Sequence, residues 1–180
     1  MSEVFFCADH HFGHKNIIKF IDSHGNRYRP FESIEEMHEV IIARHNSVVG
    51  KNDVVYFLGD ITFNPKYLCF LNEMNGEKYL VKGNHDSFSA YTYLKYFKDI
   101  QGVVKKYDFV MSHVPVHPSQ MDRWKMNVHG HLHAETIMLG DEPDLRYYNV
   151  SMEAIDFTPV HLSVITNEML KREELKNGKY

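Results

Sequence analysis

The chain has 180 residues, of which 43% are hydrophobic and 13% aromatic, so its composition is that of an ordered globular protein. A chain of this length is predicted to form a single domain over residues 1–180. Acidic residues outnumber basic ones, 24 against 20, so we expect no surface for long duplex nucleic acid. No apolar run approaches the ~20 residues needed to cross a bilayer, and no signal peptide precedes Val4, which predicts a cytoplasmic protein without membrane contacts.

The first half of the chain alternates predicted strands with predicted helices. Short apolar runs indicate strands that are buried on both faces. Ser33 and Glu36 form a capping box before a helical pattern, while Asn64-Pro65 begins a second helix that Gly76 ends. This alternation is typical of a parallel α/β sheet. The predicted strands cover residues 4–8, 53–58 and 77–81.

The second half is richer in predicted strands. Apolar runs lie at residues 103–104, 109–111 and 126–128, and a last strand is expected at 160–165. A Gly-Asp-Glu-Pro turn at 140–143 predicts a hairpin that joins 135–139 to 145–150. Helices are predicted at 90–97 and, as a charged terminal helix, at 169–176. Cys7 and Cys69 lie in apolar sequence without a CxxC spacing, so we expect two buried free thiols.

Five of the predicted strands end in side chains that can bind metal ions. Ligands in open α/β sheets lie at the carboxyl ends of the strands, where such side chains would meet. Asp9 and His11 are two residues apart and share one face of extended backbone, whereas His10 points the other way and is expected to pack. The five groups are Asp9 with His11, Asp60, Asn84 with His85, His113, and His131 with His133.

Each group has an ordinary structural interpretation when it is taken alone. An aspartate at a strand end is usually a turn or cap residue, and a single histidine such as His113 is usually a hydrogen-bonded core residue. Five such groups, each following an apolar run, favour a joint metal site over five separate coincidences. The unusual content of 13 histidines indicates a metal site only if their positions converge.

The order of these motifs resembles that of the calcineurin-like metallophosphoesterases. Their pattern D-x-H, G-D, G-N-H-[DE], x-H and G-H-x-H stands here at residues 9–11, 59–60, 83–86, 112–113 and 130–133. The resemblance covers residues 4–133 and is to small stand-alone members of bacterial or phage type. It implies an α/β fold in which two facing mixed sheets form a sandwich flanked by helices, in four layers.

The same resemblance implies two divalent metal ions, with Asp60 bound to both. Asp9, His11 and His133 would hold the first ion, and Asn84, His113 and His131 the second. Oxygen and imidazole ligands favour manganese, with iron, zinc and nickel as alternatives. A metal-bridging hydroxide is the expected nucleophile, and it would attack phosphorus in line.

His85 has a separate expected role, because it follows the ligand Asn84 without being a ligand itself. The resemblance implies that His85 stabilises the transferring group or protonates the leaving oxygen. Asp86 would either orient His85 or fix the loop, and both alternatives stay open.

The segment after Asp60 departs from the protein Ser/Thr phosphatases of the superfamily, which carry G-D-x-x-D-R-G. Because Ile61 to Asn64 lacks that arginine, phosphate contacts must come from elsewhere. The main candidates for substrate binding are His14, Arg27 and His117. Further candidates are Lys15, Asn16, Arg29, Arg123 and Asn149.

The predicted function is hydrolysis of a phosphate ester, with a nucleotide-type phosphodiester favoured. A phosphomonoesterase that acts on nucleotides or small molecules is the alternative. A non-catalytic scaffold with the family fold is a third hypothesis, but such a protein should have lost metal ligands, and all seven are present here.

Overall fold

A computed structural model describes residues 2–21 and 25–177. Its first sheet has the strand order β11-β1-β2-β3-β4. Strands β1 to β4 are mutually parallel, and β11 pairs with β1 in the antiparallel direction. The bounds are β1 Val4–Cys7, β2 Val54–Phe57, β3 Glu77–Val81, β4 Asp99–Gln101 and β11 Val160–His161.

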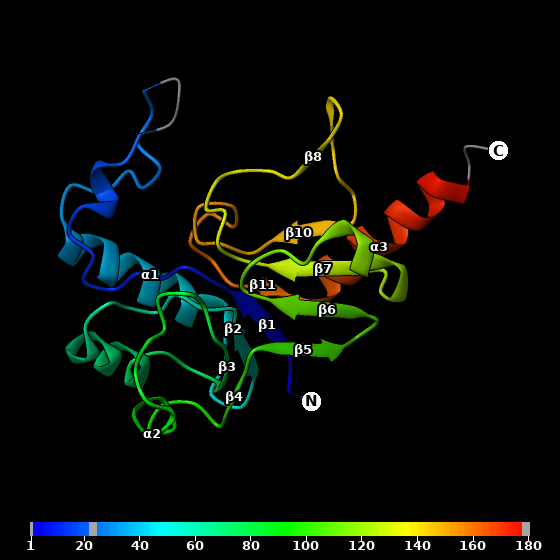
Figure 1. Cartoon of the computed structure of the whole chain (residues 1–180). Helices are drawn as coiled ribbons and strands as arrows, with labels where there is room; N and C mark the ends of the chain where they lie inside the picture. The colour runs from blue at the N-terminus through cyan, green and yellow to red at the C-terminus, as the bar shows by residue number, and fades with distance from the viewer. Residues whose placement is uncertain (1, 22–24, 178–180) are drawn as a thin grey trace.

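The second sheet has the order β10-β7-β6-β5 and is also mixed. Strands β10, β7 and β6 are parallel, whereas β5 is antiparallel to β6. The bounds are β5 Val103–Lys106, β6 Phe109–Ser112, β7 Met126–His129 and β10 Tyr147–Asn149. A separate hairpin of β8 (Met138–Leu139) and β9 (Glu142–Pro143) projects from the molecule (Figure 1).

The alternation of side chains along β1 separates two cores. Phe6 and Ala8 lie in a cluster with Phe109 and Val128 of the second sheet, so this core joins the two sheets. Phe5 and Cys7 point to the other face, where the helical layer packs. Two mixed sheets that face each other, with helices against them, confirm the predicted fold class.

Side chains that cap the first backbone N–H groups mark the starts of two helices. The Ser33 hydroxyl accepts the Glu36 N–H at 3.0 Å at the start of α1, and Asn64 caps η2 in the same way. The α-helices are α1 Ile34–Val48, α2 Ala90–Tyr93 and α3 Leu162–Asn177. The 3₁₀ helices are η1 Ile17–Lys19, η2 Pro65–Asn72 and η3 Pro118–Arg123.

Several local expectations were wrong. Cys69 is exposed, although both thiols are free as predicted. The helix predicted at 90–97 ends at Tyr93, and the strand predicted at 160–165 ends at His161, where α3 takes over seven residues before the predicted start at 169. The segment 145–150 does not pair with 135–139, because β10 joins β7 instead.

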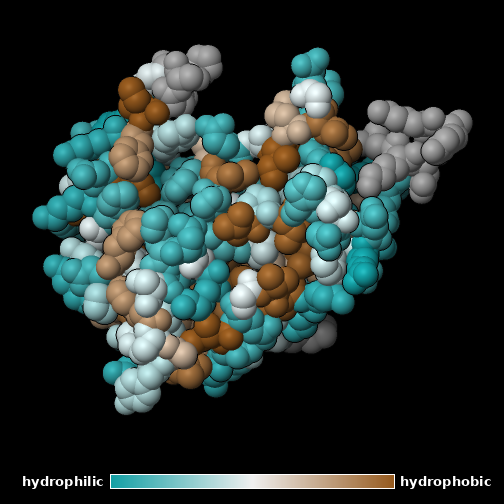
Figure 2. Space-filling view, in the orientation of Figure 1, coloured by the Kyte–Doolittle hydropathy of each residue, from teal (hydrophilic) through white to brown (hydrophobic). Residues whose placement is uncertain are grey.

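Two properties of the surface bear on partners. Within residues 2–21 and 25–177, no helix combines the length and the apolar character that a membrane crossing requires. Figure 2 shows that the face seen in Figure 1 is mainly hydrophilic, with separate apolar patches. Met138 and Leu139 of the projecting hairpin are among the exposed apolar side chains.

Candidate metal centre

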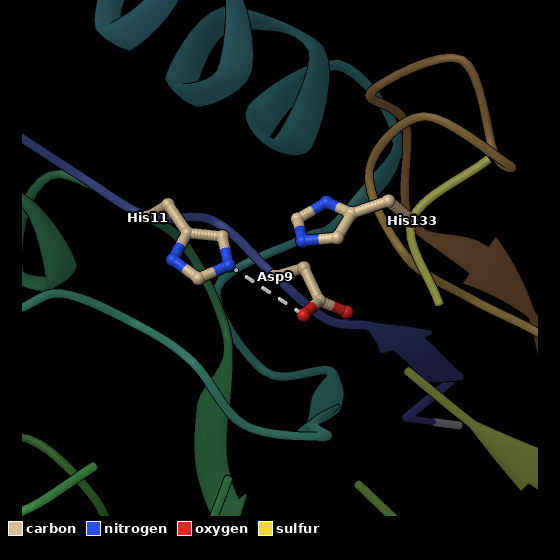
Figure 3. A group of neighbouring side chains, drawn as sticks. All are labelled: Asp9, His11 and His133. Carbon is tan, nitrogen blue, oxygen red and sulfur yellow. Dashed lines mark ion pairs between the residues drawn. The ribbon is translucent and has the colours of Figure 1, made fainter. Parts of the chain in front are cut away.

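The motif side chains meet beyond the carboxyl ends of the strands, in two groups. Asp9, His11 and His133 form the first group, and Asp60, His113 and His131 form the second. Within each group the atoms that could bind a metal all lie within 4.8 Å of one another. Figure 3 shows the first group, in which Asp9 and His11 from the segment after β1 and His133 from the segment after β7 point toward one another.

Asp60 lies between the two groups. Its Oδ2 atom is 3.3 Å from His113 Nε2, in its own group, and 3.8 Å from His11 Nε2, in the other. Its Oδ1 atom accepts the backbone N–H of His85 at 3.0 Å, which fixes the carboxylate orientation. One oxygen is therefore anchored to the protein while the other faces ligand candidates of both groups.

Asn84 joins the second group through its side-chain oxygen, which lies 2.9 Å from His113 Nε2. All seven residues that the sequence motifs indicate as ligands are therefore brought to one place. His10 instead packs between Phe12 and Phe57, with ring centroids 5.4 and 5.0 Å away, as expected from its position in the motif.

Two of the histidines are held in one tautomer by a second partner. His113 Nδ1–H donates to the Leu58 carbonyl at 2.7 Å, and His133 Nδ1 lies 2.9 Å from Glu153 Oε1. A histidine that donates from one ring nitrogen leaves the other nitrogen as an acceptor, which is the usual arrangement of metal-binding histidines. The remaining Nε2 atom of His113 lies beside the side-chain oxygens of Asn84 and Asp60, in the second group.

The first group also contains buried polar atoms that have no hydrogen-bond partner within the described part of the chain. They are Asp9 Oδ1 and both ring nitrogens of His11. Leaving a buried polar atom unpaired costs about 1–3 kcal/mol, and more for a charged group. A divalent cation would satisfy the carboxylate oxygen and an imidazole nitrogen together, so the residues present fit such an ion.

The electrostatics of the second group follow from burial and close pairing. Burial opposes charge on both Asp60 and His113, but their mutual contact outweighs it, so the pKa of Asp60 is lowered and that of His113 is raised. The carboxylate form of Asp60 is therefore favoured, which is the form that a bridging ligand needs.

The backbone that presents these side chains is strained. Five of the seven residues have positive φ: Asp9 62°, His11 49°, Asp60 57°, His131 71° and His133 51°. Non-glycine residues in such conformations cost of order 1–3 kcal/mol each, and they concentrate at functional sites. The strain turns side chains from the ends of different strands into one small volume.

Glycines allow the loops to approach one another closely. A Cβ atom on Gly83 would lie 2.1 Å from Asp60 Oδ1, and one on Gly130 would lie 2.5 Å from Asp9 Oδ2. Both glycines belong to the motifs that predicted the site. Their role is therefore to leave room for the carboxylates of neighbouring loops.

Arg29 does not contact phosphate as the sequence suggested, because it is 0% exposed. Its guanidinium donates to the Asp9 carbonyl at 2.5 Å, to the His10 carbonyl at 2.9 Å and to Glu153 at 2.6 Å. Despite its burial, Glu153 has its pKa lowered to about 2 by Arg29 and by its hydrogen bond to His133. Arg29 and Glu153 therefore position the first group, a role that sequence reasoning missed for both.

Asp86 fixes the loop, which resolves the two alternatives for this residue. Its carboxylate accepts the backbone N–H groups of Asp60, Ile61 and Gly83 at 2.8, 3.1 and 2.8 Å. The Tyr93 hydroxyl donates to the same carboxylate at 3.2 Å. Asp86 thereby ties the loop after β2 to the loop after β3.

His85 remains open to solvent, with 46% of its side chain exposed. Its Nε2 atom lies 3.9 Å from Asp60 Oδ2, and the ring of Phe63 lies 4.5 Å from its ring. The imidazole is thus beside the metal centre and accessible to a substrate.

The candidates for substrate contacts differ in where they lie and in which partners they have. His14 lies beside the site, with its ring 6.0 Å from that of His11, whereas Arg27 is engaged by Glu32 at 2.6 Å. His117 caps η3 by accepting the Ser119 N–H at 3.2 Å. Lys15, Asn16 and Arg123 are exposed, and Asn149 donates to the His133 carbonyl at 2.8 Å and so supports the site.

Comparison with known proteins places this geometry in context. A family model described as calcineurin-like phosphoesterase matches residues 3–175. An uncharacterized protein of Methanocaldococcus jannaschii is 35% identical over 176 residues, which cover 92% of this chain and 90% of that protein. The gene 66 protein of Mycobacterium phage L5 is 31% identical over 120 residues, which cover 63% of this chain and 52% of the phage protein.

A crystal structure of a protein of unknown function from Aquifex aeolicus has a similar fold. The TM-score is 0.66 at 22% identity, and the match covers 93% of this chain and 99% of that one. The similarity therefore extends over both sheets and does not stop at the motif loops.

Proposed function

The chain belongs to the calcineurin-like phosphoesterase family and is a metal-dependent phosphoesterase, and we propose that it hydrolyses phosphodiesters at a centre for two divalent ions. The observation that carries the proposal is the position of Asp60 Oδ2, which faces His113 Nε2 at 3.3 Å and His11 Nε2 at 3.8 Å. A carboxylate in that position is suited to bridge two cations, one in each group.

The proposed ligands are Asp9, His11, Asp60 and His133 for one ion and Asp60, Asn84, His113 and His131 for the other. Two divalent ions held by these residues would supply Lewis acidity and an activated water for displacement at phosphorus. The chain supplies the orientation: Glu153 and Leu58 hold the histidine rings, and Asp86 holds the loops.

His85 is proposed to act on the leaving group. It is not needed to complete either group of three, and its ring is exposed next to Asp60. An imidazole in this position can donate a proton to the departing oxygen. General acid catalysis of this kind raises the rate by about 10²–10⁴-fold.

A diester is favoured over a monoester because a monoester dianion needs more positive charge around it. The two arginines that follow the first motif are both committed to other partners. Arg27 is paired with Glu32, and Arg29 is buried against Glu153. A diester carries a single negative charge, which the metal centre itself can balance.

Three further properties belong to the same proposal. Manganese is the proposed ion on the basis of the mixed oxygen and imidazole ligands. A single domain over residues 1–180 is consistent with the shared cores, and the free thiols of Cys7 and Cys69 are consistent with a reducing cytoplasm.

The test is an assay of the manganese-loaded protein with bis-p-nitrophenyl phosphate, p-nitrophenyl phosphate and 2′,3′-cyclic nucleotides. We expect the diesters to be hydrolysed with higher kcat/KM than the monoester, and activity to disappear with a chelator. Preference for the monoester would support the phosphomonoesterase alternative. Failure to hydrolyse any of the three by the metal-loaded protein would contradict the proposed function.

A further inference from the structure

Phe63 is an aromatic residue at the edge of the metal centre that the proposed chemistry does not use. Its ring centroid lies 4.5 Å from that of His85, 5.0 Å from that of His14 and 5.3 Å from that of His11. The residue nevertheless remains 44% exposed. It therefore contacts a proposed ligand and the proposed acid while presenting part of its ring to solvent.

Exposure alone does not distinguish Phe63, since isolated apolar residues are common on protein surfaces. Its contacts do, because its ring is stacked on that of the proposed ligand His11, with 23° between the planes. The part of the ring that remains exposed is open to a planar group beside the metal centre.

The backbone on both sides of Phe63 is fixed. The Thr62 hydroxyl donates to the Phe12 carbonyl at 2.7 Å, and the Asn64 N–H donates to Thr62 Oγ1 at 3.1 Å. The Asn64 side chain in turn caps η2 by accepting the Lys66 N–H at 3.1 Å. A ring presented by anchored neighbours loses little freedom on binding a ligand, which favours affinity.

Two further rings continue the aromatic surface beside Phe63. The His14 ring is next to Phe63, and the Phe20 ring lies 5.8 Å from His14 and is 48% exposed. The surface beside the site is thus formed by the rings of Phe63, His14 and Phe20, which suits a planar base.

We propose that Phe63 forms a stacking subsite for the nucleobase of a phosphodiester substrate, so that the natural substrate carries a nucleoside next to the cleaved bond. This inference rests on the proposed phosphodiesterase function. Stacking of a base on an aromatic side chain contributes about 1–3 kcal/mol, which corresponds to about 5- to 150-fold in kcat/KM.

The experiment compares two diesters that share one leaving group. Thymidine 5′-(p-nitrophenyl) phosphate carries a base on the retained side, whereas methyl p-nitrophenyl phosphate does not. Both are assayed with the manganese-loaded full chain, with Phe63→Leu and Phe63→Trp, and with Tyr91→Leu. Tyr91 is a matched control, because it is a 76% exposed aromatic residue on α2 whose ring contacts Lys95.

The quantity measured is the ratio of the two kcat/KM values, which cancels any loss common to both esters. We expect a ratio of about ten or more for the wild type and Tyr91→Leu, a ratio near one for Phe63→Leu, and retention of the preference by Phe63→Trp. Metal content, measured on the same samples, should be equal in Phe63→Leu and the wild type.

A wild-type ratio near one, or a ratio unchanged in Phe63→Leu, would overturn the stacking subsite while leaving the phosphodiesterase function intact. Loss of metal from Phe63→Leu with equal impairment on both esters would show that the ring only packs against the imidazoles. If the wild type hydrolyses neither ester, the proposed function itself fails.

Discussion

Asp60 combines a strained backbone with a carboxylate that faces both halves of the metal centre. Asparagine also tolerates positive φ, and its side-chain oxygen can still accept the His85 N–H. Asp60→Asn therefore removes the charge while keeping the local backbone. This makes it a cleaner test of the bridging role than a substitution by alanine.

We predict that Asp60→Asn loses metal and activity together, because a neutral amide cannot balance two cations. Bound manganese, measured by elemental analysis after desalting, should fall well below the wild-type value. Asp122→Asn on η3 is the control, since this aspartate is exposed. Full metal content with near-normal turnover would show that Asp60 does not bridge.

His85→Ala should behave differently, because His85 lies beside the centre without belonging to either group of three. We predict that both metal ions stay bound and that turnover falls by about 10²–10⁴-fold for esters with alkoxide leaving groups. The loss should shrink for p-nitrophenyl esters, whose leaving group departs without a proton. A variant that is depleted of metal and equally impaired on all esters would refute the acid role.

At the residue scale, the candidate metal ligands could be predicted from the sequence, whereas the residues that position them could not. The motifs place each ligand candidate at the end of an apolar run, and strand ends meet in any parallel sheet. Glu153 follows no such run, and its contacts with His133 and Arg29 span 20 and 124 residues. Only the folded chain reveals that these distant residues form one network.

At the scale of the elements, helix α1 carries a buried histidine through which we expect the free energy of unfolding to depend on pH. His45 is 1% exposed, and its Nε2–H donates to the Asn75 carbonyl at 2.9 Å, while the buried Nδ1 has no hydrogen-bond partner. Burial, with a smaller contribution from Lys78, lowers its pKa from 6.5 to about 4. Protonation of Nδ1 would therefore place an unpaired charge in the core.

Because the folded-state pKa lies below the unfolded value, this contribution to stability is complete above pH 6.5 and is lost as the pH falls toward about 4. We predict that lowering the pH from about 7 to about 5 reduces the free energy of unfolding of the wild type by about 2 kcal/mol more than that of His45→Gln. Denaturant titrations at both pH values measure the difference. His117→Gln, at an exposed position, is the control, and equal pH dependence in His45→Gln and the wild type would contradict this role for His45.

The element boundaries show where local signals mislead. Ser33 and Asn64 are common capping residues, and the starts of the helices that they cap were predicted correctly. The second of these helices is a 3₁₀ helix that ends at Asn72 and not at Gly76 as predicted. Helix α3 instead follows His161, whose Nδ1 accepts the Ser163 N–H at 3.2 Å, and a histidine cap is not a usual start signal. The pairing of β10 with β7 is likewise non-local, so the turn at 140–143 suggested the wrong partner.

For the whole molecule, the sandwich explains how one site can draw on distant parts of the chain. Strands β1 to β3 deliver their loops from the first sheet, and β6 and β7 deliver theirs from the second. The core between the sheets holds the two sets of loops at a fixed separation. The two sheets were expected from the family resemblance, whereas the antiparallel β5 and β11 were not specified by any local pattern.

The central claim is that these loops build a centre for two ions that is needed for diester hydrolysis. Its most direct test is native mass spectrometry of the manganese-loaded chain, with diesterase activity measured on the same samples. We predict two ions per wild-type chain, and a single ion with little activity in His133→Ala and in His113→Ala, which remove one ligand from each group. A wild-type chain that hydrolyses diesters at full rate while it holds only one ion, or none, would contradict the account.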